Sequence, residues 1–279
     1  MVLTSSAVLL TIFASGCGSS SAKSEKISVV AGFYPLAFAA EQVGGEHVEV
    51  RNLTPPGAEP HDLEVSPRDV ERVRSAALVF LVGDGFQPQI ERAAGRRRGV
   101  VRVLDAAPAG GVAHGDPHVW LDPVRYAAIV RLMGVALGAP ARADRLIARL
   151  HRLDRELQTG LGHCRRREIV TSHRAFVYLA RRYRLRQIAI TGLSPEAEPA
   201  PRDLGRVVAL VRRSRATTVF FETLITPRLA ETVARESGAQ TATLNPIEGL
   251  TAAESRRGED YFSLMRANLR TLRQALACR

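Results

Sequence analysis

The sequence predicts an α/β protein of two lobes, each a mostly parallel sheet flanked by helices, joined by one long rigid helix. Three observations carry this prediction. The chain has 279 residues, which is enough for two domains that each bury a core. Runs of β-branched residues alternate with helical patterns in both halves. Between the halves, residues 141–163 show leucines at spacings of four, three and four, which indicates one long amphipathic helix.

The first lobe is expected over residues 27–140. It opens with "KISVVAGFYPLAFAAEQVGG", in which a β-branched run, a loop and a helical pattern end at paired glycines. A capped helix is predicted from Ser66-Pro67. Further strands are predicted in residues 47–55, 77–83 and 100–106, and a further helix in 124–139.

The second lobe is expected over residues 164–279. Strand patterns that end in loops occur in residues 167–173, 186–193, 217–224 and 240–247, separated by helical segments. Two similar lobes joined by a helix predict a cleft faced by the loops at the strand ends.

Composition limits the functional classes. Hydrophobic residues make up 46% and charged residues 24%, as in a soluble globular body. The net charge of +11 comes mostly from arginines scattered through helical segments, and aromatic residues make up only 5%. Because no nucleic-acid-binding motif and few stacking side chains are present, we expect no nucleic-acid partner. A solvated basic face or attraction to an anionic membrane surface explains the charge.

Residues 1–17 are predicted to be an export signal, and residues 18–26 a polar tether. The apolar run "VLLTIFASGC" is too short to span a bilayer and ends in small residues before Cys17. This end resembles the lipobox of bacterial lipoproteins, whose cysteine becomes lipidated, although Ala14 stands where leucine is usual and no Lys or Arg precedes the run. A plain secretory peptide is the alternative. We therefore expect an extracytoplasmic protein, anchored to the cell membrane through Cys17.

That compartment suggests a disulfide between Cys164 and Cys278, the two remaining cysteines. It would fix the last helix to the start of the second lobe. Two unpaired buried thiols remain the alternative, because the sequence does not give the distance between them.

Three histidines are candidate metal ligands: His61 after a proline-rich loop, His118 in "GDPHVWLDP", and His173 at the end of "IVTSH". A single histidine is usually structural, but three near strand ends can converge on the cleft, where neutral imidazoles suit zinc. In "GDPHVWLDP", the prolines restrict the chain and Trp120 offers an apolar anchor. Its two aspartates, at 116 and 122, could orient an imidazole or cap the next helix.

Taken together, "PPGAEPHDLEVSPRDV", "GDPHVWLDP", "IVTSHRAFVYLA", "GLSPEAEPAPRDL" and "LNPIEGLT" resemble the zinc-binding solute receptors of bacterial ABC importers, the ZnuA-like and AdcA-like family. The resemblance covers nearly everything from Ile27 onward. It implies two lobes joined by a rigid helix, Zn(II) in the cleft on His61, His118 and His173, and an ABC permease with its ATPase as partners. Manganese receptors of the superfamily typically have glutamate where this chain has His173, which favours zinc.

The resemblance leaves two candidates for the fourth ligand. One subgroup has aspartate where this chain has Asn245, and another uses a glutamate that matches Glu248. We favour Glu248, because an anionic ligand offsets the charge of the dication, whereas Asn245 offers a neutral oxygen. Water at the fourth position is the alternative to both.

Other functions remain as alternatives to zinc capture. A zinc hydrolase would need a general base such as Glu222, yet no H-E-x-x-H pattern is present. A manganese receptor or an adhesin of the same fold is a further alternative. We expect a monomeric, non-enzymatic receptor.

Overall fold

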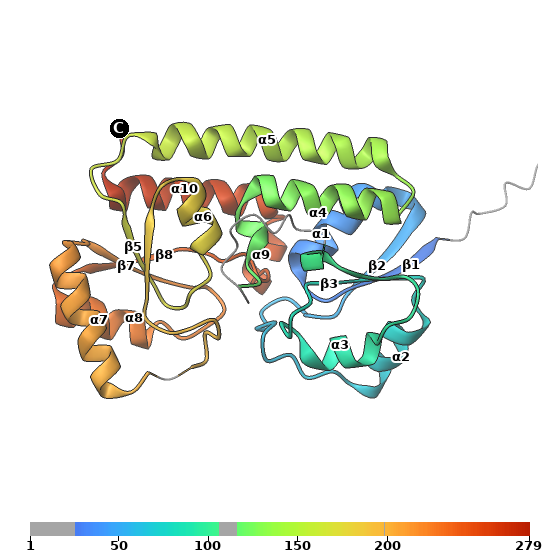
Figure 1. Cartoon of the computed structure of the whole chain (residues 1–279), viewed down its shortest axis with the longest axis horizontal. Helices are drawn as coiled ribbons and strands as arrows, with labels where there is room; N and C mark the ends of the chain where they lie inside the picture. The colour runs from blue at the N-terminus through green and yellow to red at the C-terminus, as the bar shows by residue number, and fades with distance from the viewer. Residues whose placement is uncertain (1–25, 106–115, 198) are drawn as a thin grey trace, which may run out of the picture.

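A computed structural model of the protein describes residues 26–105, 116–197 and 199–279. It contains two α/β lobes that lie side by side beneath a layer of helices (Figure 1). This arrangement confirms the predicted fold class. The predicted export signal, Cys17 and residues 18–25 of the tether lie outside the described residues.

The N-terminal lobe is a parallel sheet with the strand order β2-β1-β3-β4. Its strands are β1 (Ile27–Ala31), β2 (Val48–Asn52), β3 (Leu78–Leu81) and β4 (Val100–Arg102). Its helices are α1 (Tyr34–Gly44), α2 (Pro67–Ser75), α3 (Pro88–Ala94) and α4 (Pro123–Ala136), with short 3-10 turns η1 (Gly45–His47), η2 (Val103–Asp105) and η3 (Val119–Leu121). The predicted start of α2 is confirmed, because Ser66 caps it in a reciprocal pair with Asp69.

Alternation along β1 explains why helices cover both faces of this sheet. Val29 and Ala31 point into the core shared with α1 and α4, whereas Val30 points into a second core formed with α2 and α3. A strand that is buried on both faces reads as a continuous apolar run, which is the pattern seen in the sequence.

The C-terminal lobe repeats this plan with the strand order β6-β5-β7-β8, again all parallel. Its strands are β5 (Glu168–Thr171), β6 (Arg186–Ala189), β7 (Thr218–Phe221) and β8 (Gln240–Thr243). Its helices are α6 (Val177–Arg182), α7 (Pro201–Ser214), α8 (Arg228–Ser237), α9 (Ala252–Arg256) and α10 (Tyr261–Leu276). α7 and α8 cover one face through a separate apolar cluster.

Helix α5 (Pro140–Gly162) runs across both lobes, with α10 beside it over the C-terminal lobe (Figure 1). Its leucines are buried in one apolar core that continues from α1 and α4 into α6 and α10. Cys164, just after α5, forms a disulfide with Cys278 at the end of α10. The lobes are therefore joined through a continuous core rather than through a free linker. Within the described residues, no helix combines the length and the apolar character that a membrane span requires.

Candidate metal site

Four side chains converge between the lobes: His61, His118, His173 and Glu248. One possible ligand atom from each lies within 4.8 Å of the others. His61 and His118 come from the N-terminal lobe, and His173 and Glu248 from the C-terminal lobe. Three of the four side chains are fully buried. Buried groups of this kind, brought together from distant parts of the chain, form a potential metal site.

Four of the six distances between these atoms match the edges of a zinc tetrahedron. Oε1 of Glu248 lies 3.0 Å from Nε2 of His118 and 3.4 Å from Nε2 of His173. The same oxygen lies 3.4 Å from Nε2 of His61, and the two nitrogens of His118 and His173 are 3.2 Å apart. With ligand bonds of 2.0–2.1 Å, the edge of a tetrahedron measures about 3.3 Å. The four atoms can thus reach a common zinc ion with only small adjustments.

Carboxylates orient two of the imidazoles. Nδ1 of His118 lies 2.8 Å from Asp116, and Nδ1 of His173 lies 2.8 Å from Glu222. Because an ionised carboxylate only accepts, each Nδ1 keeps its proton, and each Nε2 can lose its own proton and turn a lone pair to a metal ion at the centre of the site. Glu222 also accepts from the backbone N–H of His173. This carboxylate is therefore engaged in holding a ligand, and is not free to act as a general base.

Electrostatics also prepare the site for a cation. Burial raises the pKa of Glu248, but hydrogen bonds from the three imidazoles outweigh it and hold that pKa well below its ordinary value. Burial lowers the pKa of His173, yet the hydrogen bond to Glu222 and the charges of Glu222 and Glu248 raise it to about 10. Burial also lowers the pKa of His118, but the hydrogen bonds to Asp116 and Glu248 outweigh it and raise that pKa above its ordinary value. Without metal, protons on the imidazoles balance the carboxylates, and a dication can replace them.

The loop around His118 is fixed from both lobes. Asp122 caps α4 through the N–H of Val124, as its position before Pro123 suggested. Nε1 of Trp120 donates to the carbonyl of Pro246 at 2.8 Å, so the indole connects this loop to the segment that carries Glu248. The predicted anchor therefore makes a polar contact across the cleft as well as an apolar one.

Asn245 shapes the segment before Glu248. Its Oδ1 accepts from the N–H of Ile247, which has a φ of 58°, a conformation that β-branched residues avoid. Its Nδ2 donates to Glu254, and its backbone N–H donates to Asn268. Since its side chain is hydrogen-bonded to both Ile247 and Glu254, Asn245 holds the turn that aims Glu248 at the histidines.

The histidines occupy less uniform positions than the sequence suggested. Only His173 lies directly after a strand, two residues beyond β5. His61 lies in the long loop between β2 and α2, and His118 precedes η3. Sequence reasoning also missed Asn268 and Glu254 as partners of Asn245, because nothing in their local pattern indicates a contact with a distant loop.

Comparison with known proteins identifies relatives of the whole described body. The profile of the family "Zinc-uptake complex component A periplasmic" matches residues 29–275. The zinc-binding lipoprotein AdcA of Streptococcus pneumoniae is 31% identical over 299 aligned positions, covering 96% of this chain and 59% of AdcA. This chain thus spans less than two thirds of that relative.

Solved structures agree with this comparison. The laminin-binding protein Lmb of Streptococcus agalactiae, described as bifunctional with adhesin and metal-transporting activity, has a TM-score of 0.81 at 29% identity, with 90% of this chain and 99% of Lmb covered. The Zn(II)-bound ZnuA-like domain of Streptococcus pneumoniae AdcA has a TM-score of 0.75 at 30% identity and covers 90% of this chain and 99% of the domain.

Proposed function

This chain belongs to the family of zinc-uptake complex component A, periplasmic, and on that premise we propose that it is an extracytoplasmic receptor that captures Zn(II) and delivers it to an ABC importer. The proposed ligands are His61, His118, His173 and Glu248. The observation that carries the proposal is that their ligand atoms all lie within 4.8 Å of one another, with four of the six separations at 3.0–3.4 Å, the edge length of a zinc tetrahedron. Three imidazoles and one carboxylate replace the water of the ion, and no chemical step follows.

The ligand set favours zinc over the alternatives. Manganese prefers oxygen ligands and six-coordinate geometry, whereas this site offers three nitrogens and one carboxylate. A zinc hydrolase needs a coordination position for water and a free base near it. Here Glu248 takes the fourth position and Glu222 is held by His173. Capture of the ion is therefore a better match to the geometry than hydrolysis.

The partners and location belong to the same proposal. An ABC permease and its ATPase receive the ion, and the protein works as a monomer held at the cell membrane by lipid on Cys17. The lipobox-like "ASGC" and the relative named as a zinc-binding lipoprotein support the anchor.

The decisive experiment is elemental analysis of the purified protein, followed by competition between zinc and manganese. We expect one zinc per chain and retention of zinc against a large excess of manganese. Protein that loads manganese as readily as zinc would contradict the proposal.

Adhesion is a second candidate, and the similarity to Lmb is the observation that raises it. Binding of the purified protein to immobilised laminin, with and without zinc, tests it. Binding that does not exceed that of an unrelated protein of equal charge would exclude adhesion to this ligand.

A further inference from the structure

A groove lined by arginines lies between α5 and α10, away from the metal site. Its volume is about 760 Å³. It is lined by Arg152, Arg155, Glu156, Thr159, Gly160, Arg266, Leu269, Arg270, Arg273 and Arg279. None of these residues contributes an atom to the zinc ligands or to their carboxylate partners. The groove therefore needs its own explanation.

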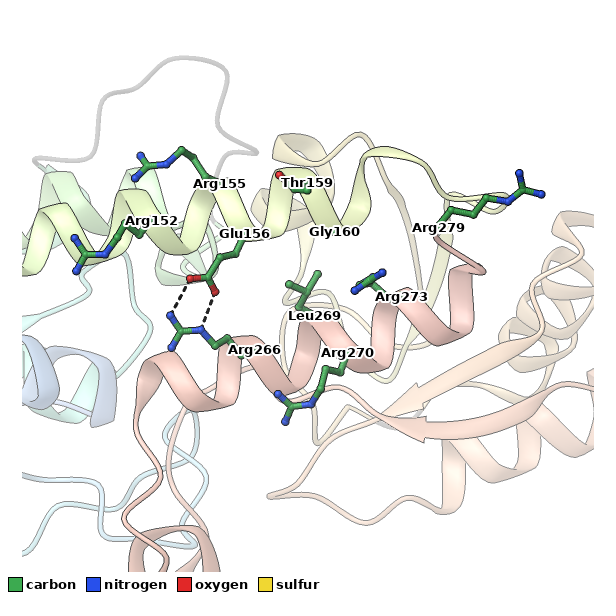
Figure 2. A pocket seen from close by; sticks show the side chains of 10 residues that line it. All are labelled: Arg152, Arg155, Glu156, Thr159, Gly160, Arg266, Leu269, Arg270, Arg273 and Arg279. Carbon is green, nitrogen blue, oxygen red and sulfur yellow. Dashed lines mark hydrogen bonds and ion pairs between the residues drawn. The ribbon is translucent and has the colours of Figure 1, made fainter.

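Its charge is largely uncompensated. Arg266 forms a two-point ion pair with Glu156 at 2.7 and 3.0 Å (Figure 2). Among the described residues, the remaining groove arginines form no ion pair within 4.0 Å. Glu259 interacts with Arg270 electrostatically, without a direct ion pair between the two side chains. Several guanidinium groups held near one another without partners create a positive field that attracts an anion.

The shape of the groove depends on a close approach of the two helices. A side chain at Gly160 would meet Leu269 at 2.9 Å and the stem of Arg273 at 3.3 Å. Glycine at this position lets α10 lie close to α5, so Arg273 lies between the helices while Arg152 and Arg155 lie on α5 above it (Figure 2). The cations thus lie along both helices and are exposed to solvent.

We propose that this groove binds a linear polyanion, a flexible chain of phosphodiester groups. The lining extends over eight residues of each helix, from Arg152 to Thr159 and from Arg266 to Arg273, which corresponds to about 10 Å along the axis. Guanidinium groups bind phosphate oxygens through paired N–H donors, and several arranged in a row neutralise several anionic groups of one chain. A narrow chain can lie along the groove and contact arginines of both helices, which favours a linear polyanion.

The test uses the zinc-loaded protein and a fluorescein-labelled oligomer of propanediol phosphodiesters, followed by fluorescence anisotropy at several salt concentrations. The groove variant replaces four arginines with glutamine, at 152, 155, 270 and 273. The matched control removes the same charge from exposed arginines of the other lobe, at 74, 92, 96 and 98. Zinc content and circular dichroism show that both variants remain folded and loaded.

We expect the groove variant to bind the oligomer at least tenfold more weakly at low salt, and the control to bind nearly as tightly as the parent. Each phosphate contact on a flexible strand contributes about 0.7 to the slope of log affinity against log salt, so loss of four contacts should reduce the slope by about 3. If the control variant loses as much affinity for the oligomer as the groove variant, binding depends on net charge rather than on the groove, and the proposal is wrong. Binding to phosphatidylglycerol vesicles that requires the groove, with no binding of the oligomer, would overturn it in favour of a membrane surface.

Discussion

Replacement of Glu248 by glutamine tests the fourth ligand directly, because it removes a charge while nearly keeping the shape. Glu248 is buried, and its Oε1 lies within 3.4 Å of all three imidazoles. Its other oxygen, Oε2, has no hydrogen-bond partner among the described residues, which leaves it available to a cation. A neutral amide at this position would leave the charge of the dication uncompensated in a buried site.

The size of the effect follows from two opposing contributions. Removing one partner of a buried charge pair costs about 3–5 kcal/mol, or roughly 10²-fold to several thousandfold in affinity. Part of this loss is offset, because Glu248 also raises the pKa of His118 and His173 in the metal-free protein, and its removal makes those imidazoles easier to deprotonate. We therefore expect zinc binding to weaken by about 10²-fold, near the lower limit.

Competition titration against a zinc chelator at fixed pH measures this change, with two Asn245 variants as comparison. Asn245→Ala loosens the turn but leaves the charge, so it should weaken zinc by about tenfold, as for groups that support a ligand. Asn245→Asp should change affinity less than Glu248→Gln does. If Glu248→Gln binds zinc like the parent while Asn245→Ala loses it, the fourth ligand belongs to the asparagine position and the reasoning is wrong.

The other expectations concern the imidazoles, pH and the anchor. Changing any one of the three histidine ligands to alanine should weaken zinc by at least about 10²-fold by the same titration, while His151→Ala on α5 should not; equal, small effects at all four would refute the site. The pKa of His173 is raised from 6.5 to about 10 in the folded metal-free protein, so its contribution to stability is complete below pH 6.5 and disappears as pH rises towards about 10. Zinc competes with those protons, so the increase in Tm caused by zinc should grow as pH rises over this window. Thermal unfolding with and without zinc measures this increase, and an increase that does not change with pH would contradict the reasoning. Finally, Cys17→Ser should release the protein into the soluble extracytoplasmic fraction, and a variant that stays with the membrane contradicts lipid anchoring.

Much of the fold could be predicted because it depends on local patterns. The leucine spacing of α5 and the Ser-Pro pair at the start of α2 act within one or two helical turns, so periodicity and capping identify them. The parallel sheets follow from alternating strands and helices. The continuity of the core across both lobes could not be predicted, because it depends on how α10 returns to pack beside α5.

The site shows the same division between local and distant information. The three histidines stand out because residue type and position near loops suffice to suggest them. Whether Asn245 or Glu248 faces the histidines depends on the turn at Ile247, which Asn245 itself stabilises. The contact of Trp120 with Pro246 joins residues separated by 126 positions, and no local pattern indicates it.

The joining of the lobes also bears on how metal reaches the site. On α6, Arg182 donates to Asp154 of α5 at 2.5 and 2.6 Å, and lies 3.3 Å from Asp122 at the start of α4. Together with the shared core, this network resists a wide hinge opening.

His61 is the one proposed ligand whose side chain keeps some exposure, 11% against 0% for the other three. Its loop crosses to the other lobe where the N–H of Gly57 donates to the carbonyl of Leu250. We therefore expect the ion to exchange through a local movement of this loop around His61 rather than through separation of the lobes.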